Sequence, residues 1–311
     1  MEVDELVRGV LARERRAVAR AISAVEDGDA DLESLSAGLY PRTGTAATIG
    51  LTGAPGVGKS TLAAGLVGAA RARDLPVAVL AVDPTSPYTG GALLGDRVRM
   101  QEHATDPGVF IRSMATRGHL GGMALAAPEA VRILDAAGYE RVVVETVGVG
   151  QAEVDVAAAT DTAVVVLAPG LGDAVQMAKA GILEVADIFV VNKADRDGAS
   201  EVVRELRQML HLGAARDWDP PVLTASASLG EGIEELWEAI ESHRDHLAAS
   251  GALAAKRRSR LIREVESLAA ERFRLRAAEA LRADPQLADE LEARRLDPYR
   301  AAAMLASRAA E

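Results

Sequence analysis

A glycine-rich stretch that begins at Gly53 carries the residue types that bind the phosphates of a nucleotide. It fits the pattern GxxxxGKS/T and consists of Gly53, Ala54, Pro55, Gly56, Val57, Gly58, Lys59, Ser60 and Thr61. Glycines let successive backbone N–H groups turn toward phosphate oxygens, lysine brings a positive charge, and the serine hydroxyl can bind Mg²⁺. The alternative is a glycine-rich turn without a ligand. An apolar run before the stretch and a helical pattern after it favour a phosphate-binding loop.

A second polar motif follows an apolar run at residues 188–191 and indicates which base is bound. The motif NKxD places Asp195 where its carboxylate can accept hydrogen bonds from guanine N1–H and the N2 amine. Adenine lacks this donor pair, so a buried Asp195 would be left unpaired against ATP. We expect Asn192 to tie the base-binding loops together and the Lys193 stem to lie along the base. The alternative is a polar turn after a strand.

A weaker signal for the base site comes later in the chain. Ser226 and Ala227 also follow a short apolar run, at residues 222–224. A backbone N–H at this position would be able to donate to guanine O6.

Carboxylates follow several of the apolar runs that lie between the two motifs. Asp83 and Glu145 end such runs, and Asp96 lies in a glycine-bounded loop. Together with the Ser60 hydroxyl they supply the oxygen ligands that Mg²⁺ prefers beside a triphosphate. The alternative is that these acids only cap loops. The chain has five histidines and no cysteine, which argues against a site for a softer metal.

Short apolar runs alternate with helical patterns from residue 45 to 246, which is typical of a mainly parallel sheet covered by helices. This alternation predicts an α/β P-loop domain. The expected strands are Ala47–Thr52, Val77–Val82, Arg141–Thr146, Ala163–Ala168, Ile188–Asn192 and Val222–Thr224.

Helical segments flank this domain on both sides. Residues 1–44 have apolar residues at helical spacing, and residues 247–311 lack apolar runs of strand length. We expect a charged helix over 256–283, then two short helices that begin with Asp-Pro pairs at Asp284 and Asp297. Apolar residues near heptad spacing mark the long helix: Leu261, Val265, Leu268 and Leu275. This segment either packs on its own domain or serves as an arm for self-association.

The composition excludes some classes of protein. The net charge of the 311 residues is −11, which argues against non-specific binding to nucleic acid. Hydrophobic residues make up 49% of the chain, enough for a sizeable core. The sequence shows neither a secretory signal pattern nor an apolar run of about 20 residues, so we expect a cytoplasmic protein without a membrane span.

Several motifs occur together in an order that resembles one family, and the likeness extends over nearly the whole chain. They are Thr52–Thr61, Val82–Pro87, Gly90 and Gly91 with Leu94–Arg97, Glu145–Gln151, and Ala186–Ile188 with Asn192–Asp195. In this order they strongly resemble the methylmalonyl-CoA mutase-associated GTPases, the MeaB/ArgK group of SIMIBI-type P-loop proteins. The resemblance implies hydrolysis of GTP to GDP with Mg²⁺, by a chaperone for an adenosylcobalamin-dependent acyl-CoA mutase. Such a chaperone gates cofactor loading from a cobalamin adenosyltransferase and protects or reactivates the mutase.

The resemblance also implies a homodimer formed through the C-terminal arm, and roles for individual residues. Motif positions assign phosphate, magnesium and switch roles to Lys59, Ser60, Asp83, Asp96, Glu145 and Lys179, with Asp173 in the last switch loop. Glu145 and Gln151 are candidates to orient the attacking water. Three positions depart from the family pattern and concern switch coupling, namely Ala152, Ala174 and Ala180.

Two other functions would use the same phosphate-binding loop. An ATPase or kinase that acts on a transport-system binding protein would share the phosphate loop, but the NKxD motif argues against it. A metal-insertion GTPase would need cysteine or clustered histidine for its metal, and the sequence offers neither.

Overall fold

The computed structural model describes residues 2–28, 31–84, 103, 105–116, 122–146, 156, 158–170, 185–212 and 217–309. The chain forms two compact units, Met1–Arg258 and Ser259–Glu311. The boundary expected at residue 246 falls inside helix α11 (Ile233–Ser250), so the helix belongs to the first unit as a whole.

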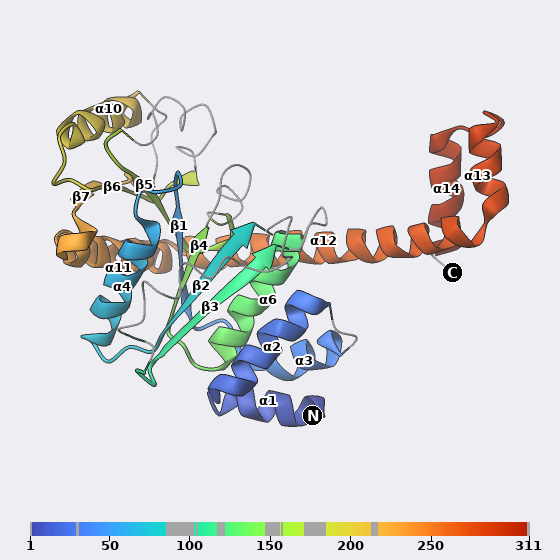
Figure 1. Ribbon diagram of the computed structural model, residues 1–311, viewed down its shortest axis with the longest axis horizontal. Helices are drawn as coiled ribbons and strands as arrows, with labels where there is room; N and C mark the ends of the chain where they lie inside the picture. The colour runs from blue at the N-terminus through green and yellow to red at the C-terminus, as the bar shows by residue number, and fades with distance from the viewer. Residues whose placement is uncertain are drawn as a thin grey trace. The chain divides into compact units, whose positions relative to one another are not determined.

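Seven strands of the described chain form one sheet in the order β3-β2-β4-β1-β5-β6-β7, and every pairing is parallel. All strands therefore end at the same edge, which we call the carboxyl edge, and β1 lies in the middle between β4 and β5 (Figure 1). The strands are β1 (Ala47–Thr52), β2 (Val77–Pro84), β3 (Val109–Thr116), β4 (Arg141–Thr146), β5 (Thr162–Leu167), β6 (Ile188–Asn192) and β7 (Val222–Ala225).

Six of these strands were expected from the sequence, and β3 was missed. Arg112 and Ser113 interrupt its apolar pattern. The arginine finds its partners in another element, because Arg112 Nη2 donates to Ser23 Oγ at 2.9 Å and to Glu26 Oε2 at 2.5 Å. Both partners lie in helix α2 (Arg15–Asp27). A long-range partner thus allows a charged residue within an edge strand.

Helices cover both faces of the sheet, because strands buried on both sides need apolar cover. On one face, α4 (Lys59–Arg71) and α11 pack on side chains that include Leu51, Val79 and Val143. On the other, α6 (Gly122–Ala136) and the N-terminal helices pack on Leu80 and Val144. Helix α10 (Ala199–His211) covers β6 and β7 (Figure 1).

The helical N-terminal extension expected over residues 1–44 is confirmed. It consists of α1 (Val3–Leu11), α2 (Arg15–Asp27), α3 (Leu32–Leu39) and the 3₁₀ turn Tyr40–Arg42. Its apolar side chains share one core with α6, which fixes the extension to the first unit.

The predicted helices of the C-terminal segment are also confirmed, as α12 (Ala252–Ala283), α13 (Pro285–Glu292) and α14 (Pro298–Ala309). Asp284 caps α13 by accepting a hydrogen bond from the Leu287 N–H at 3.2 Å. Asp297 accepts from the N–H groups of Tyr299 and Arg300 at the start of α14, at 3.0 and 3.1 Å. None of the described helices combines the length and the hydropathy that a membrane crossing requires.

Candidate nucleotide site

The glycine-rich stretch forms a loop between the carboxyl end of β1 and the start of α4, as the sequence predicts. Gly53 and Gly58 adopt left-handed backbone angles, with φ of 138° and 101°. A Cβ atom on Gly53 would lie 2.1 Å from the carbonyl oxygen of Val166, and one on Gly58 would lie 2.2 Å from Asn192 Nδ2. Both positions therefore require glycine, because any side chain would clash with a neighbouring strand or with the base-site asparagine.

The N-terminus of α4 is built to hold an anion. Gly58 precedes the helix, no side chain of the described residues caps it, and its first turn contains no acidic residue. The N–H groups of that turn lack intrahelical partners, and the helix dipole is positive at this end. A phosphate group is a suitable acceptor for them.

Lys59 and Ser60 open α4, and both are buried. The Lys59 ammonium donates to the carbonyl oxygens of Gly53 and Ala54, at 2.5 and 3.1 Å. The positive charge is therefore held over the loop where the β and γ phosphates would bind.

The base motif is joined to the phosphate loop through Asn192, at the end of β6. Asn192 Nδ2 donates to the carbonyl of Val57 at 2.8 Å, and its Oδ1 accepts from the Ala227 N–H at 3.1 Å. One side chain thus ties together the loops after β1, β6 and β7, which is the role expected from the sequence. Lys193 adds a second tie, because its Nζ donates to the Gly56 carbonyl at 2.6 Å.

Two details of the base site differ from expectation. Asp195 is exposed rather than buried. Its carboxylate would therefore discriminate between guanine and adenine only where the bound base itself shields it from water. The backbone N–H groups of Ser226 and Ala227 are already used, by the Glu231 carbonyl at 3.0 Å and by Asn192. Neither donates to guanine O6 unless it gives up that bond.

The carboxylate of Glu145 lies fully buried near the end of β4. Its partners in neighbouring strands are Leu51 of β1 and Ala81 of β2. Leu51 packs in the core beneath α4, so Glu145 shares the sheet face that α4 and Ser60 cover. Sequence reasoning placed these two oxygen donors in one site, and the fold brings their elements together.

The other expected magnesium and switch residues cannot be placed in the same way. Asp83 is the last residue but one of β2, two residues beyond Ala81, and only its backbone is described. Asp96, Gln151, Asp173 and Lys179 lie outside the described residues. Within the described ranges no three metal-binding side chains gather. The described donors, a hydroxyl and a carboxylate, have the hard-oxygen chemistry that suits Mg²⁺.

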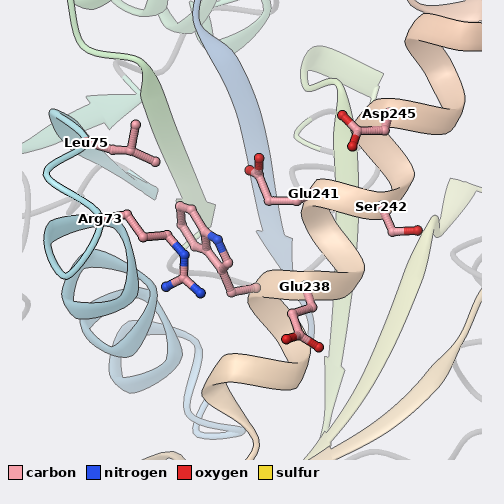
Figure 2. A pocket seen from close by; sticks show the side chains of 7 residues that line it. Arg73, Leu75, Glu238, Glu241, Ser242 and Asp245 are labelled. Atoms are coloured by element: carbon pink, nitrogen blue, oxygen red, sulfur yellow. The ribbon is translucent and has the colours of Figure 1, made fainter.

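A separate surface pocket of about 500 Å³ lies at the opposite, amino edge of the sheet. Figure 2 shows Arg73 and Leu75 facing the α11 side chains that complete it, namely Glu238, Glu241, Ser242 and Asp245, and Trp237 also lines it. Glu241 is matched within the protein, because Arg141 donates to both of its carboxylate oxygens at 2.9 and 2.8 Å. The pocket lies away from the phosphate loop and does not belong to the nucleotide site.

The family described as methylmalonyl Co-A mutase-associated GTPase MeaB matches residues 18–282. The chain belongs to this family. A putative GTPase of Pyrococcus horikoshii is 49% identical over 304 residues and covers 96% of each chain. The GTPase ArgK of Escherichia coli is 39% identical over 267 residues, which is 83% of this chain and 81% of the relative.

A solved structure supports the fold over its full length. The crystal structure described as an LAO/AO transport system kinase superposes with a TM-score of 0.72 and 28% identity, covering 99% of this chain and 98% of the other. The SIMIBI-type α/β fold expected from the sequence is confirmed, and the family identifies the enzyme as a GTPase.

Sequence reasoning missed two residues at the carboxyl edge. Thr52 and Thr146 are the last residues of β1 and β4, and both are fully buried. The available signal was a threonine as the last residue of each strand, next to the glycine-rich stretch in one case and to Glu145 in the other.

Proposed function

We propose that this GTPase is a cytoplasmic chaperone for an adenosylcobalamin-dependent acyl-CoA mutase, methylmalonyl-CoA mutase or a relative. It would gate cofactor loading from a cobalamin adenosyltransferase and protect or reactivate the mutase. The observation that carries this proposal is the match of residues 18–282 to a family described as mutase-associated.

Hydrolysis would proceed by positioning and charge neutralisation rather than by covalent chemistry. The N–H groups of the phosphate loop and the Lys59 ammonium would hold the β and γ phosphates. Ser60, Asp83, Asp96 and Glu145 are the proposed ligands of Mg²⁺, which neutralises charge on the phosphates when it is bound.

The attacking water would be oriented by Glu145 or Gln151. Glu145 supports this role because the strand register puts it on the sheet face that α4 covers. At the other end of the nucleotide, Asp195 would accept two hydrogen bonds from guanine.

The mutase would sense the nucleotide through loops at the carboxyl edge. Asp96, Gln151, Asp173 and Lys179 follow strand ends in the sequence, and all strands of the described sheet end at that edge. If the loops change state with the nucleotide, a mutase that binds one loop state more tightly shifts the equilibrium between the states. By linkage, this shift changes the affinity for the nucleotide or the rate of its hydrolysis.

Two kinetic series test this coupling. We expect a cognate mutase to raise GTP turnover, and Lys179→Ala to weaken that stimulation more than it weakens GTP binding. Arg204→Ala is the control, because Arg204 is a highly exposed charge on α10. If Lys179→Ala and wild type are stimulated equally, Lys179 has no switch role. If no candidate mutase stimulates the wild type, the chaperone proposal fails.

We also propose that residues 247–311 form a dimerisation arm. The predicted stripe on α12 is exposed, from 39% for Leu261 to 64% for Val265. Contiguous exposed apolar side chains of this kind are typical of protein interfaces. The double variant Val265→Glu and Leu268→Glu should run as a monomer in light scattering and still bind GTP, whereas Glu266→Ala should remain dimeric. A wild type that is itself monomeric at micromolar concentration would exclude this arm function.

The two alternative functions have less support. A kinase named for a transport system is similar in structure, but the relatives named for their activity are GTPases. A metal-insertion role would need soft ligands, and the chain has no cysteine.

A further inference from the structure

Two buried threonines at the carboxyl edge have no evident role in holding the fold together. Thr52 and Thr146 are both 0% exposed, and neither hydroxyl has a hydrogen-bond partner among the described residues. Burying a hydroxyl without a partner costs free energy. Valine has the same shape, is favoured in strands, and would remove this cost. The described contacts therefore do not explain why these strands end in threonine.

The two hydroxyls belong to one location. In the register of the parallel pair, Leu51 of β1 lies beside Glu145 of β4, so Thr52 and Thr146 are the next residues on adjacent strands. Neighbouring strands are about 4.8 Å apart, and both side chains point to the same face. Thr52 immediately precedes Gly53 of the phosphate loop, and Thr146 immediately follows Glu145. The pair therefore lies at the two strand ends that carry the phosphate loop and the proposed magnesium ligand, on the sheet face opposite to the Glu145 side chain.

Other buried threonines of this sheet are satisfied within the protein. Thr48, in the same strand as Thr52, accepts a hydrogen bond from the Asp161 N–H at 2.7 Å. Thr162 shares a hydrogen bond of 2.9 Å with His243 Nδ1. These two residues lie at the amino edge. These threonine hydroxyls at the amino edge have partners within the protein, whereas Thr52 and Thr146, next to the nucleotide site, have none among the described residues. This difference points to a partner that binds together with the nucleotide.

We propose that Thr52 and Thr146 are positioning residues for GTP hydrolysis. In the complex with GTP and Mg²⁺ their hydroxyls acquire hydrogen-bond partners through ordered water, and this fixes the ends of β1 and β4 for the hydrolytic step. A buried water needs two or more polar partners, and two adjacent hydroxyls supply them. The proposal rests on the phosphate site described above.

The experiment compares three isosteric variants of the full chain: Thr52→Val, Thr146→Val and the control Thr48→Val. Melting without nucleotide, kcat and KM are measured for each. Thr52→Val and Thr146→Val should melt at the wild-type temperature or slightly above it, while kcat falls about tenfold and KM changes less than about threefold. Thr52→Ser and Thr146→Ser should recover most of kcat, because they restore the hydroxyl.

Thr48→Val should show the opposite pattern. It removes the closer of two acceptors of the Asp161 N–H, which keeps its 3.0 Å hydrogen bond to the Thr48 carbonyl, so the melting temperature should fall slightly while kcat stays within about twofold of wild type. If the other two valine variants keep wild-type kcat, or if they lose stability as Thr48→Val does, the positioning proposal is wrong. A Lys59→Ala variant shows whether only the threonine proposal is wrong or whether the phosphate site itself has been assigned wrongly. If Lys59→Ala still binds GTP tightly, the site itself is wrong, and the threonine proposal falls with it.

Discussion

The two edges of the central sheet differ in what their buried polar groups contact. At the amino edge, Asp161 is 2% exposed and accepts from both Nε and Nη2 of Arg257, at 3.2 and 2.7 Å. At the carboxyl edge, the hydroxyls of Thr52 and Thr146 have no such partner among the described residues. A buried hydroxyl that the described chain does not satisfy calls for a partner from outside it, and a bound nucleotide with its ordered water can supply one.

The amino edge is closed by further contacts of the same kind. Arg257 also donates to the backbone carbonyls of Gly44 and Ala46, at 2.5 and 2.7 Å. Lys256 Nζ donates to the Asp161 carbonyl at 2.7 Å and to Asp187 Oδ2 at 3.1 Å. This network fixes the second turn of α12 to the segments that precede β1, β5 and β6.

The largest expected effect is the loss of nucleotide binding in Lys59→Ala. Removing the cation that faces the β and γ phosphates should weaken GTP binding by at least about a thousandfold, with little change in melting. Isothermal titration calorimetry measures the affinity. Lys256→Ala is the matched control, since it removes a lysine of the amino edge and should lower stability without changing GTP affinity. Equal GTP affinity in Lys59→Ala and wild type would contradict the phosphate site.

Arg257→Ala should produce the converse result. It leaves the buried Asp161 carboxylate without its cation, so we expect a loss of about 3 kcal/mol in the free energy of unfolding. GTP affinity of the folded protein should stay within about threefold of wild type. Denaturant unfolding measures the loss. Arg274→Ala, which breaks an exposed bidentate pair with Glu271, should change stability little. If the two variants are equally stable, the amino-edge network does not hold the fold.

Asp195→Asn should change which base is bound. The amide donates to the 2-oxo group of xanthine where the carboxylate only accepts, so GTP binding should weaken about a hundredfold and xanthosine triphosphate should bind better. Competition between the two nucleotides measures the change. Asp197→Asn alters a neighbouring exposed carboxylate and should keep the preference for GTP. Guanine preference that survives Asp195→Asn would move the base site elsewhere.

The smallest expected effect is on the pH dependence of stability, through His243 at the amino edge. Burial lowers the pKa of His243 below its ordinary value, partly opposed by the charge of Asp187, whose Oδ1 lies 3.4 Å from Nε2. The unfolded chain therefore binds more protons than the folded protein below about pH 6.5, so stability is complete above that pH and declines as pH falls.

His243→Gln should flatten the decline in melting temperature between about pH 7 and 5, while GTP affinity at pH 7 is unchanged. His211→Gln, at an exposed histidine of α10, should leave the pH dependence as it is in wild type. An identical pH dependence in His243→Gln and wild type would show that His243 does not contribute.

The carboxyl edge was largely predictable from the sequence, and the amino edge was not. GxxxxGKS/T and NKxD are local patterns, because each loop must present its groups to one ligand from consecutive residues. Asp161 and Arg257 lie 96 residues apart, and no spacing rule connects them. β3 was missed for the same reason, since the partners that satisfy Arg112 lie in α2. The sequence also did not show that the Ser226 and Ala227 amides are used within the protein.

Hydrogen exchange of the wild type with and without GTP and Mg²⁺ tests the difference between the two edges most directly. The nucleotide should slow exchange at residues 52–61, 192–195 and 225–229, and should leave residues 44–48, 161–163 and 243–257 unchanged. ATP at the same concentration should produce little protection. Protection centred on the amino edge, or on the pocket between Arg73 and α11, would contradict the assignment of the carboxyl edge as the guanine-nucleotide site.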